Sequence, residues 1–142
     1  MNATTETTKV TRTSLEYQER ITLTTNLFGI NFPLKLEPTI YGITDRLAPE
    51  YRGGFWRFWR LDNGGFYMAP DAEDRFKVHC MNYWEGELSA DALGIVSCLT
   101  AYSHLSFGGP EGFARDCARH YHLLREYMYD HAEVVAILGA ID

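Results

Sequence analysis

The stretch YRGGFWRFWRLDNGGFYMAPD, residues 51–71, holds seven aromatic side chains, three arginines and four glycines. Asn63-Gly64 lies between its two aromatic runs. Asn-Gly between apolar runs is the strongest short-range signal for a β-hairpin with a two-residue type I′ turn. The stretch therefore predicts two antiparallel strands that meet at this turn, and it raises the question of whether its rings form core or a surface for another molecule.

A two-residue turn at Asn63-Gly64 also sets the register of the hairpin, in which Trp59 faces Met68 and Arg60 faces Tyr67. Successive side chains of a strand point to opposite faces, so one face is predicted to form core and the other to be covered by a helix or partly exposed. The predicted core face carries Phe55, Arg57, Trp59, Leu61, Phe66 and Met68, and the second face carries Trp56, Phe58, Arg60, Tyr67 and Ala69.

Patterns on either side of the hairpin predict the other elements. Residues 14–32 mix helical and extended signals and stay unassigned. Residues 39–47 predict a short helix between Pro38 and Pro49, with Thr39 as its cap. Alternating side chains predict a third strand near residues 75–81 and a short fourth strand before Ser89, which caps a helix with Asp91 in its first turn. Further helices are predicted over residues 111–129 and from about residue 132.

This order of a helix, an antiparallel meander and three helices predicts an α+β fold. We expect a single compact domain over residues 14–142, in which a small antiparallel β-meander of three or four strands packs against several helices. A chain of 142 residues is long enough to bury one hydrophobic core. Residues 1–13 are polar, threonine-rich and without periodicity, and they predict a flexible N-terminal tail.

The net charge of the chain disfavours two classes of function, namely DNA binding and DNA mimicry. The net charge of −6 opposes non-specific binding to DNA phosphates. It is also too small for a full mimic of duplex DNA, which presents one charge per ~1.7 Å of its axis. Residues 61–91 carry seven acidic side chains against two basic ones, so this segment could dock on a basic partner or simply keep the protein soluble.

Cysteine content and hydropathy predict a cytoplasmic protein. Cys80, Cys98 and Cys117 are widely spaced and form no CxxC pair, which favours buried thiols in a reducing compartment over a disulfide framework. No apolar run approaches the ~20 residues of a membrane span. The N-terminus lacks the basic and apolar pattern of a secretion signal.

The sequence carries no clear motif for catalysis, a cofactor or a metal, and we expect none of the three. His120 and His122 are two residues apart on a predicted helix, so their side chains diverge by roughly 200°. A Cys/His hydrolase, for example one using Cys98 with His104, stays open because such partners meet only in the fold. A direct nucleic-acid binder is the second alternative, although Gly54 stands where an RNA-recognition strand needs an aromatic residue.

Three segments together resemble the ArdB/KlcA-type antirestriction family. They are YRGGFWRFWRLDNGGFYMAP at residues 51–70, EGELSADALGIVSCLTAYSHL at residues 85–105 and ILGAID at residues 137–142. The resemblance extends over roughly residues 28–142, and no single segment is specific by itself. Much of the pattern also has a role in folding, since Gly64 permits a positive φ and Ser89 caps a helix.

The resemblance implies a small bacterial cytoplasmic protein, often carried by plasmids and other mobile elements. Such proteins protect incoming DNA from type I restriction enzymes and are not enzymes. We therefore expect a partner in the type I restriction complex, bound through protein–protein contact, and no strong direct DNA binding. Aromatic and arginine side chains are typical anchors of interfaces, and acidic side chains can engage a basic partner. On these grounds the candidate partner-binding residues are Arg52, Trp56, Arg60, Tyr67, Asp71, Glu73, Asp74 and Asp142.

Overall fold

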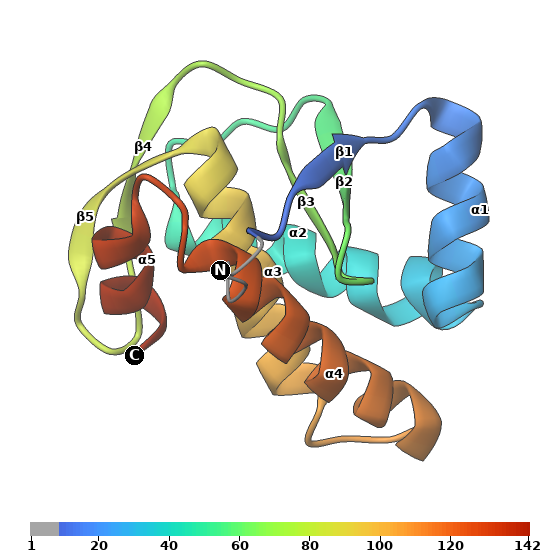
Figure 1. The fold of residues 1–142 in the computed structure, drawn as a ribbon. Helices are drawn as coiled ribbons and strands as arrows, with labels where there is room; N and C mark the ends of the chain where they lie inside the picture. The colour runs from blue at the N-terminus through green and yellow to red at the C-terminus, as the bar shows by residue number, and fades with distance from the viewer. Residues whose placement is uncertain (1–8) are drawn as a thin grey trace, which may run out of the picture.

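A computed structural model describes residues 9–142, which form five α-helices, one π-helical turn and five strands (Figure 1). The predicted α+β class is confirmed, and so is the sequence of a helix, antiparallel strands and three helices from residue 37 onward; the strand and the helix before it were not predicted. The elements are β1 (Arg12–Ser14), α1 (Tyr17–Phe28), η1 (Phe32–Leu36), α2 (Glu37–Leu47), β2 (Trp56–Leu61), β3 (Phe66–Pro70), β4 (Arg75–His79), β5 (Glu85–Ser89), α3 (Ala90–Leu105), α4 (Glu111–Met128) and α5 (Val134–Ile141).

The hairpin between β2 and β3 forms as predicted, but its predicted register is wrong by one residue. Arg60 pairs with Phe66 and Trp59 pairs with Tyr67. The loop has three residues rather than two, because the Leu61 N–H donates to the Gly65 carbonyl at 2.9 Å. Gly64 takes a φ of +95°, which fits the left-handed position of a three-residue hairpin loop. The Asn63 side chain accepts a hydrogen bond from the Gly65 N–H and donates one to Leu123 O on α4.

The predicted assignment of faces is wrong for β2. Trp56 and Phe58 are buried, whereas Phe55 and Arg57, predicted to face the core, are exposed. Strand β3 is buried along its whole length. Because helices cover β3 on both sides, rings of both alternating sets become core, and a two-sided division into core and surface does not apply.

The strands form two sheets where one meander was predicted. Strands β1, β2 and β3 pair in that order, while β4 and β5 pair only with each other. The pairing of β1 also corrects the predicted tail. Residues 1–8 lie outside the described residues, but Arg12 and Thr13 belong to a strand, with Thr13 opposite Arg60. Residues 12 and 13 are thus part of the sheet, because the edge of β2 offers them hydrogen-bonding partners.

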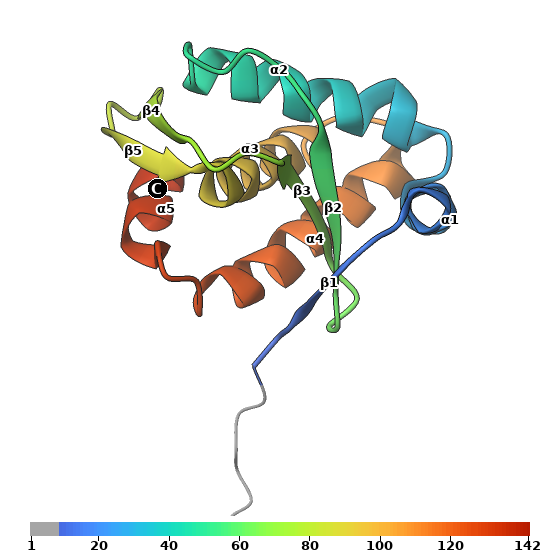
Figure 2. The same ribbon diagram turned by 90° about the horizontal axis from the view of Figure 1, so that it is seen from above.

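Helix α3 forms the centre of the molecule and lies between α2 and α4 (Figure 2). Its side chains are buried on every face rather than along one stripe, as expected of a helix that is apolar all round. The predicted cap is confirmed, since Ser89 Oγ accepts a hydrogen bond from the Ala92 N–H at 3.1 Å. Within the described part of the chain, no helix has the length and apolar character needed to cross a bilayer.

The predicted helix over residues 39–47 is confirmed, but it has no cap at Thr39. Helical backbone begins earlier, at η1, and continues into α2. Pro33 and Pro38 lie in the first positions of η1 and α2 instead of ending a segment. A proline is tolerated there because the first turn of a helix does not need its missing N–H. Figure 2 shows η1 and α2 as one long rod beside α3.

His120 on α4 is a buried histidine among aromatic rings. It is 1% exposed, and its ring centroid lies 4.8 Å from that of Phe28 and 5.8 Å from that of Tyr102. Its Nδ1 atom has no hydrogen-bonding partner among the described residues. Burial, with a smaller contribution from the charge of Arg119, lowers the pKa of His120 to about 4.

The lowered pKa of His120 predicts that the protein loses stability in mild acid. Between pH 6.5 and pH 4 the histidine is protonated in the unfolded chain but neutral in the folded protein. The free energy of unfolding therefore falls as the pH falls. From pH 7 to pH 5 the contribution of His120 is about 2 kcal/mol. Chemical denaturation at the two pH values should show a smaller loss in His120→Phe than in the wild type. His122→Phe, at an exposed position on the same helix, should keep the wild-type loss. Equal losses in all three proteins would contradict this role of His120.

Candidate functional site

The structure does not bring the predicted partner-binding residues together on one surface. Trp56 is 5% exposed and Tyr67 is 0% exposed, so neither ring is available to a partner in this conformation. Arg52 and Arg60 are exposed. Among residues 9–142 the predicted exposed face of rings and guanidinium groups is therefore absent, because Trp56 packs against Tyr41 on α2 and Phe58 packs against Phe32 on η1. Tyr67 packs between Trp59 and Tyr127.

The acidic candidates lie in two places. Asp71, Glu73 and Asp74 are exposed in the loop between β3 and β4, and Asp71 lies 3.5 Å from Arg57. Asp142 follows α5, on the opposite side of the molecule from α1 in Figure 1, and lies 3.6 Å from Arg125. Only the three loop residues are close enough in the chain to act as one patch. We call residues 71–74 the acidic loop.

Tyr67 is the centre of a polar network that the sequence did not predict. Its hydroxyl donates to Asp91 Oδ1 at 2.8 Å and accepts a hydrogen bond from Arg12 Nη1 at 2.6 Å. Arg12 also donates to Asp91 Oδ1 at 2.8 Å and stacks over the Trp59 ring, 3.8 Å from its centroid. These contacts fasten β1 to β3 and to the first turn of α3.

His131 completes this network from the segment before α5. The Glu133 N–H donates to His131 Nδ1 at 2.9 Å, so a neutral ring carries its proton on Nε2 and donates it to Asp91 Oδ2 at 2.9 Å. Burial opposes ionisation of Asp91, but hydrogen bonds from His131 and Tyr67 and the charge of Arg12 outweigh it and lower the pKa of Asp91. The Tyr67 hydroxyl, both oxygens of Asp91 and both ring nitrogens of His131 are paired, which favours a structural role over a catalytic one.

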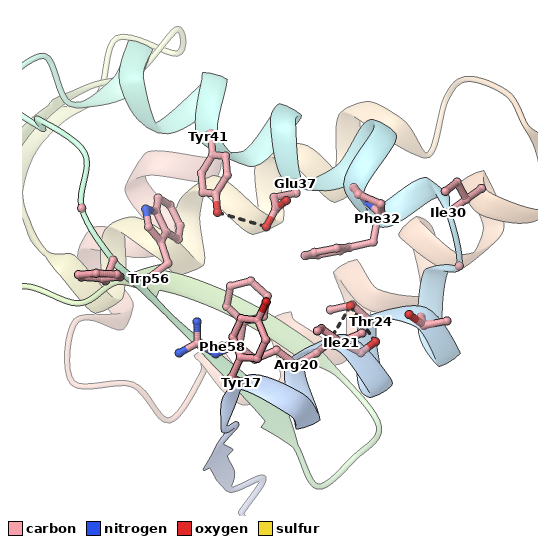
Figure 3. A pocket seen from close by; sticks show the side chains of 15 residues that line it. Tyr17, Arg20, Ile21, Thr24, Ile30, Phe32, Glu37, Tyr41, Trp56 and Phe58 are labelled. Carbon is pink, nitrogen blue, oxygen red and sulfur yellow. Dashed lines mark hydrogen bonds between the residues drawn. The ribbon is translucent and has the colours of Figure 1, made fainter.

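An apolar groove lies between α1 and α2, with a volume of about 580 Å³. Figure 3 shows Tyr17, Arg20 and Ile21 on the α1 side facing Glu37 and Tyr41 on α2. Trp56, Phe58 and Phe32 form its floor. Because residues 14–32 mix helical and extended signals, the wall formed by α1 was not predicted from the sequence. The pair Glu16 and Glu19 was the available signal, since the two side chains form a capping box at the start of α1.

The rim of the groove holds large apolar side chains that remain in solvent. Tyr17 is 76% exposed, Ile30 is 67% exposed and Phe55 is 89% exposed, and Ile21 and Tyr41 are partly exposed beside them. Gly54 lines the groove with a φ of +130°, a conformation that suits glycine and turns the chain toward Phe55. A contiguous exposed apolar patch of this kind is typical of a site that binds another molecule.

The polar groups of the groove are held in fixed positions by the walls. The Arg20 guanidinium donates to Leu15 O at 3.2 Å and lies 4.8 Å from the Phe58 ring centroid. Tyr41 donates to Glu37 at 3.2 Å, and burial together with the charge of Glu37 raises the pKa of Tyr41. The groove thus offers one cation and one carboxylate on opposite walls, and its other polar side-chain groups include hydroxyls of threonine and tyrosine. Such a surface can bind an apolar group, and the raised pKa of Tyr41 disfavours its hydroxyl as a nucleophile.

Cys98 and His104, the pair considered from the sequence, differ in exposure and do not form an accessible pair. Cys98 is buried and burial raises its pKa to about 12, whereas His104 is exposed. Burial likewise raises the pKa of Cys117 to about 12. Among the described residues, no group of three or more His, Cys, Asp or Glu side chains is arranged to hold a metal ion.

Comparisons with known proteins identify the family to which the chain is similar. Residues 49–142 match the model of a family described as antirestriction protein. The floor of the groove on β2 lies inside the matched range, while both helical walls lie before it. Two relatives from Escherichia coli span nearly the whole chain. The protein YafX of strain K12, described as uncharacterised, is 38% identical over 141 residues, which are 94% of this chain and 89% of YafX. An antirestriction protein KlcA is 36% identical over 135 residues, 94% of this chain and 95% of that protein.

A solved structure is similar over almost the entire fold. It aligns with a TM-score of 0.87 and 35% sequence identity, and covers 99% of this chain and 100% of the solved chain. That work describes KlcA and ArdB proteins as having a novel fold and antirestriction activity against type I DNA restriction systems in vivo but not in vitro. The likeness includes the region of α1 and α2 that the family model does not match.

Proposed function

The chain belongs to the antirestriction protein family, and from this premise we propose that it protects incoming plasmid or other mobile-element DNA from type I restriction enzymes of a bacterial host. The observation that carries the proposal is the likeness over 99% of the chain to a protein with activity against type I systems in vivo. The proposed place of action is the cytoplasm, where restriction enzymes meet entering DNA.

The proposed mode of action is protein–protein contact with the restriction complex, without catalysis and without a cofactor. The exposed rings and aliphatic side chains around the groove support this mode, because apolar and aromatic anchors dominate binding at interfaces. The net charge of −6 supports a protein partner over DNA, since phosphates repel an acidic surface. Of the candidates from the sequence, the acidic loop adjoins the groove, since the Asp71 N–H donates to Phe55 O. Arg52, Arg60 and Asp142 stay candidates at other exposed positions.

The proposal is tested by restriction of unmodified phage in living cells. Expression of the protein should raise the plating efficiency of unmodified phage on a host with a type I system. It should leave plating unchanged on an otherwise identical host with a type II system. Unchanged restriction by the type I host, at protein levels verified by immunoblot, would contradict the proposal. Equal relief in both hosts would contradict the type I target.

The alternative of a Cys/His hydrolase makes an opposite prediction for the three cysteines. Cys80 and His79 line one pocket, but no hydrogen bond joins them, His79 pairs with Glu85, and burial raises the pKa of Cys80. Replacing Cys80, Cys98 and Cys117 together with alanine should therefore leave phage protection at the wild-type level per folded protein. The amount of folded protein is measured by circular dichroism and soluble yield. Loss of protection by a folded triple variant would revive the enzymatic alternative.

The alternative of direct DNA binding is tested by an electrophoretic mobility shift at low salt, where electrostatic binding to DNA is strongest. We expect no shift of duplex DNA at micromolar protein. A shift that disappears as salt is added would support the DNA-binding alternative instead.

A further inference from the structure

The apolar groove ends beside the acidic loop. The Asp71 N–H donates to Phe55 O at 2.8 Å, at the point where β2 and β3 separate. Phe55 belongs to the rim of the groove, and Asp71 is the first residue of the loop. A molecule that covers Phe55 is therefore within reach of the loop as well.

The loop carries more negative charge than its neighbours neutralise. Arg57 pairs with Asp71, while Arg75 pairs with Glu87 and Glu133 instead of the loop. Among residues 9–142, no lysine, arginine or histidine forms an ion pair with Glu73 or Asp74. Two exposed carboxylates thus remain available to a cation from another molecule.

We propose that the groove and the acidic loop form one docking surface for an amphipathic helix of the restriction complex, whose apolar face enters the groove and whose end carries lysine or arginine. This inference rests on the proposed function and names the chemistry of the partner. A helix laid in an apolar groove is a recurrent mode of recognition, read through anchors on one helix face. Basic side chains at its end meet Glu73 and Asp74, which gives the helix a direction in the groove.

Charge favours a basic helix over a second copy of the chain as the molecule bound in the groove. A second copy brings another net charge of −6 and its own acidic loop, and like charges brought together at an interface oppose binding. A small apolar molecule would fit the volume, but it would leave Phe55 and the acidic loop without a role. A basic amphipathic helix uses the groove, the rim and the loop together.

The first test uses synthetic peptides and the purified protein, without a restriction enzyme. The probe is a helical peptide of about 18 residues with leucine along one face and three lysines at one end. The comparison peptide carries three glutamates at that end. Titration of the ¹⁵N-labelled protein should show tighter binding of the lysine peptide by at least about tenfold, a loss of this preference in high salt, and shift changes in residues 17–41, 54–58 and 71–74. Equal binding of both peptides, no binding, or shifts confined to another surface would overturn the proposal.

The second test asks whether the same surface acts in cells. The groove variant Ile21→Glu/Phe55→Asp should lose at least about tenfold of phage protection, because a charge in an apolar contact removes an anchor. The matched control Val135→Glu/Phe107→Asp makes the same changes at residues that are 81% and 88% exposed and do not line the groove. It should keep full protection.

The loop has its own variant with a charge-matched control. Glu73→Lys/Asp74→Lys should lose protection by at least about tenfold, while Asp45→Lys/Asp130→Lys, with the same change in net charge at exposed positions, should not. All variants are first shown to be folded by thermal melting. If the wild type protects and both surface variants protect equally well, the docking surface is wrong while the antirestriction role stands. If the wild type gives no protection, the proposed function fails, and the peptide titration still decides the chemistry of the groove.

Discussion

Gly94→Ala is expected to remove at least about 3 kcal/mol of stability, more than overpacking of a core commonly does. Helix α3 meets β3 directly at this glycine. A Cβ atom at residue 94 would lie 2.3 Å from the Cβ of Ala69, 2.4 Å from its Cα and 2.6 Å from Met68 O. Two of these three atoms belong to the backbone of a fully buried strand, which cannot move aside without separating β3 from β2 or from α3.

The matched control is Gly42→Ala in α2. A Cβ there would meet nothing within 4 Å, so the better helix propensity of alanine should leave stability unchanged or raise it by up to about 1 kcal/mol. Urea denaturation of the two variants and the wild type gives the comparison. A Gly94→Ala protein as stable as Gly42→Ala would show that α3 and β3 are farther apart than described.

Asp91→Ala is the second large effect, with an expected loss of roughly 3 kcal/mol. The carboxylate accepts hydrogen bonds from Tyr67, Arg12 and His131. Its removal leaves the Tyr67 hydroxyl, in a side chain with no exposed surface, without the acceptor for its proton, and it leaves Arg12 without a counter-charge. Buried polar groups that lose a partner are costly because water cannot replace it.

The part of the chain that Asp91→Ala destabilises first distinguishes a loss of the polar network from a general loss of packing. Because Arg12 holds β1 through Asp91 and Tyr67, amide hydrogen exchange in Asp91→Ala should rise first in residues 11–15. Asp45→Ala, at an exposed position in α2, should change stability by no more than about 0.5 kcal/mol. A uniform rise in exchange across the protein, or no rise in β1, would contradict the network as the fastening of that strand.

Local signals predicted most of the elements, but they did not predict the hairpin register. Ser89 and the apolar spacing after it are sufficient to place α3, since capping and periodicity are properties of neighbouring residues. The loop at residues 62–64 depends on a distant contact, because the Asn63 side chain donates to Leu123 O on α4. A one-residue change in loop length moves every side chain of β2 relative to β3. The predicted interface of Trp56 and Tyr67 failed for this reason and because helices cover β3 on both sides.

The candidate site was predictable only in part. Asp71, Glu73 and Asp74 could be named from charge alone, and the structure places them in one exposed loop. The groove could not be named, since α1 carries a weak apolar pattern and its Ile21 and Tyr17 point to solvent at the rim. Ile21 and Tyr17 form the rim of a groove only in the tertiary structure, where α1 and α2 lie on either side of β2 (Figure 3).

The most direct test of the account is site-specific photocrosslinking in cells with an active type I system. A benzoylphenylalanine at position 55, in the rim of the groove, is compared with one at position 107, which is equally exposed outside it. Both proteins must first be shown to protect phage. We predict that position 55 crosslinks to a subunit of the restriction complex, identified by mass spectrometry, and that position 107 does not. Protection by both proteins with no restriction subunit crosslinked at position 55 above the level at position 107 would contradict the account.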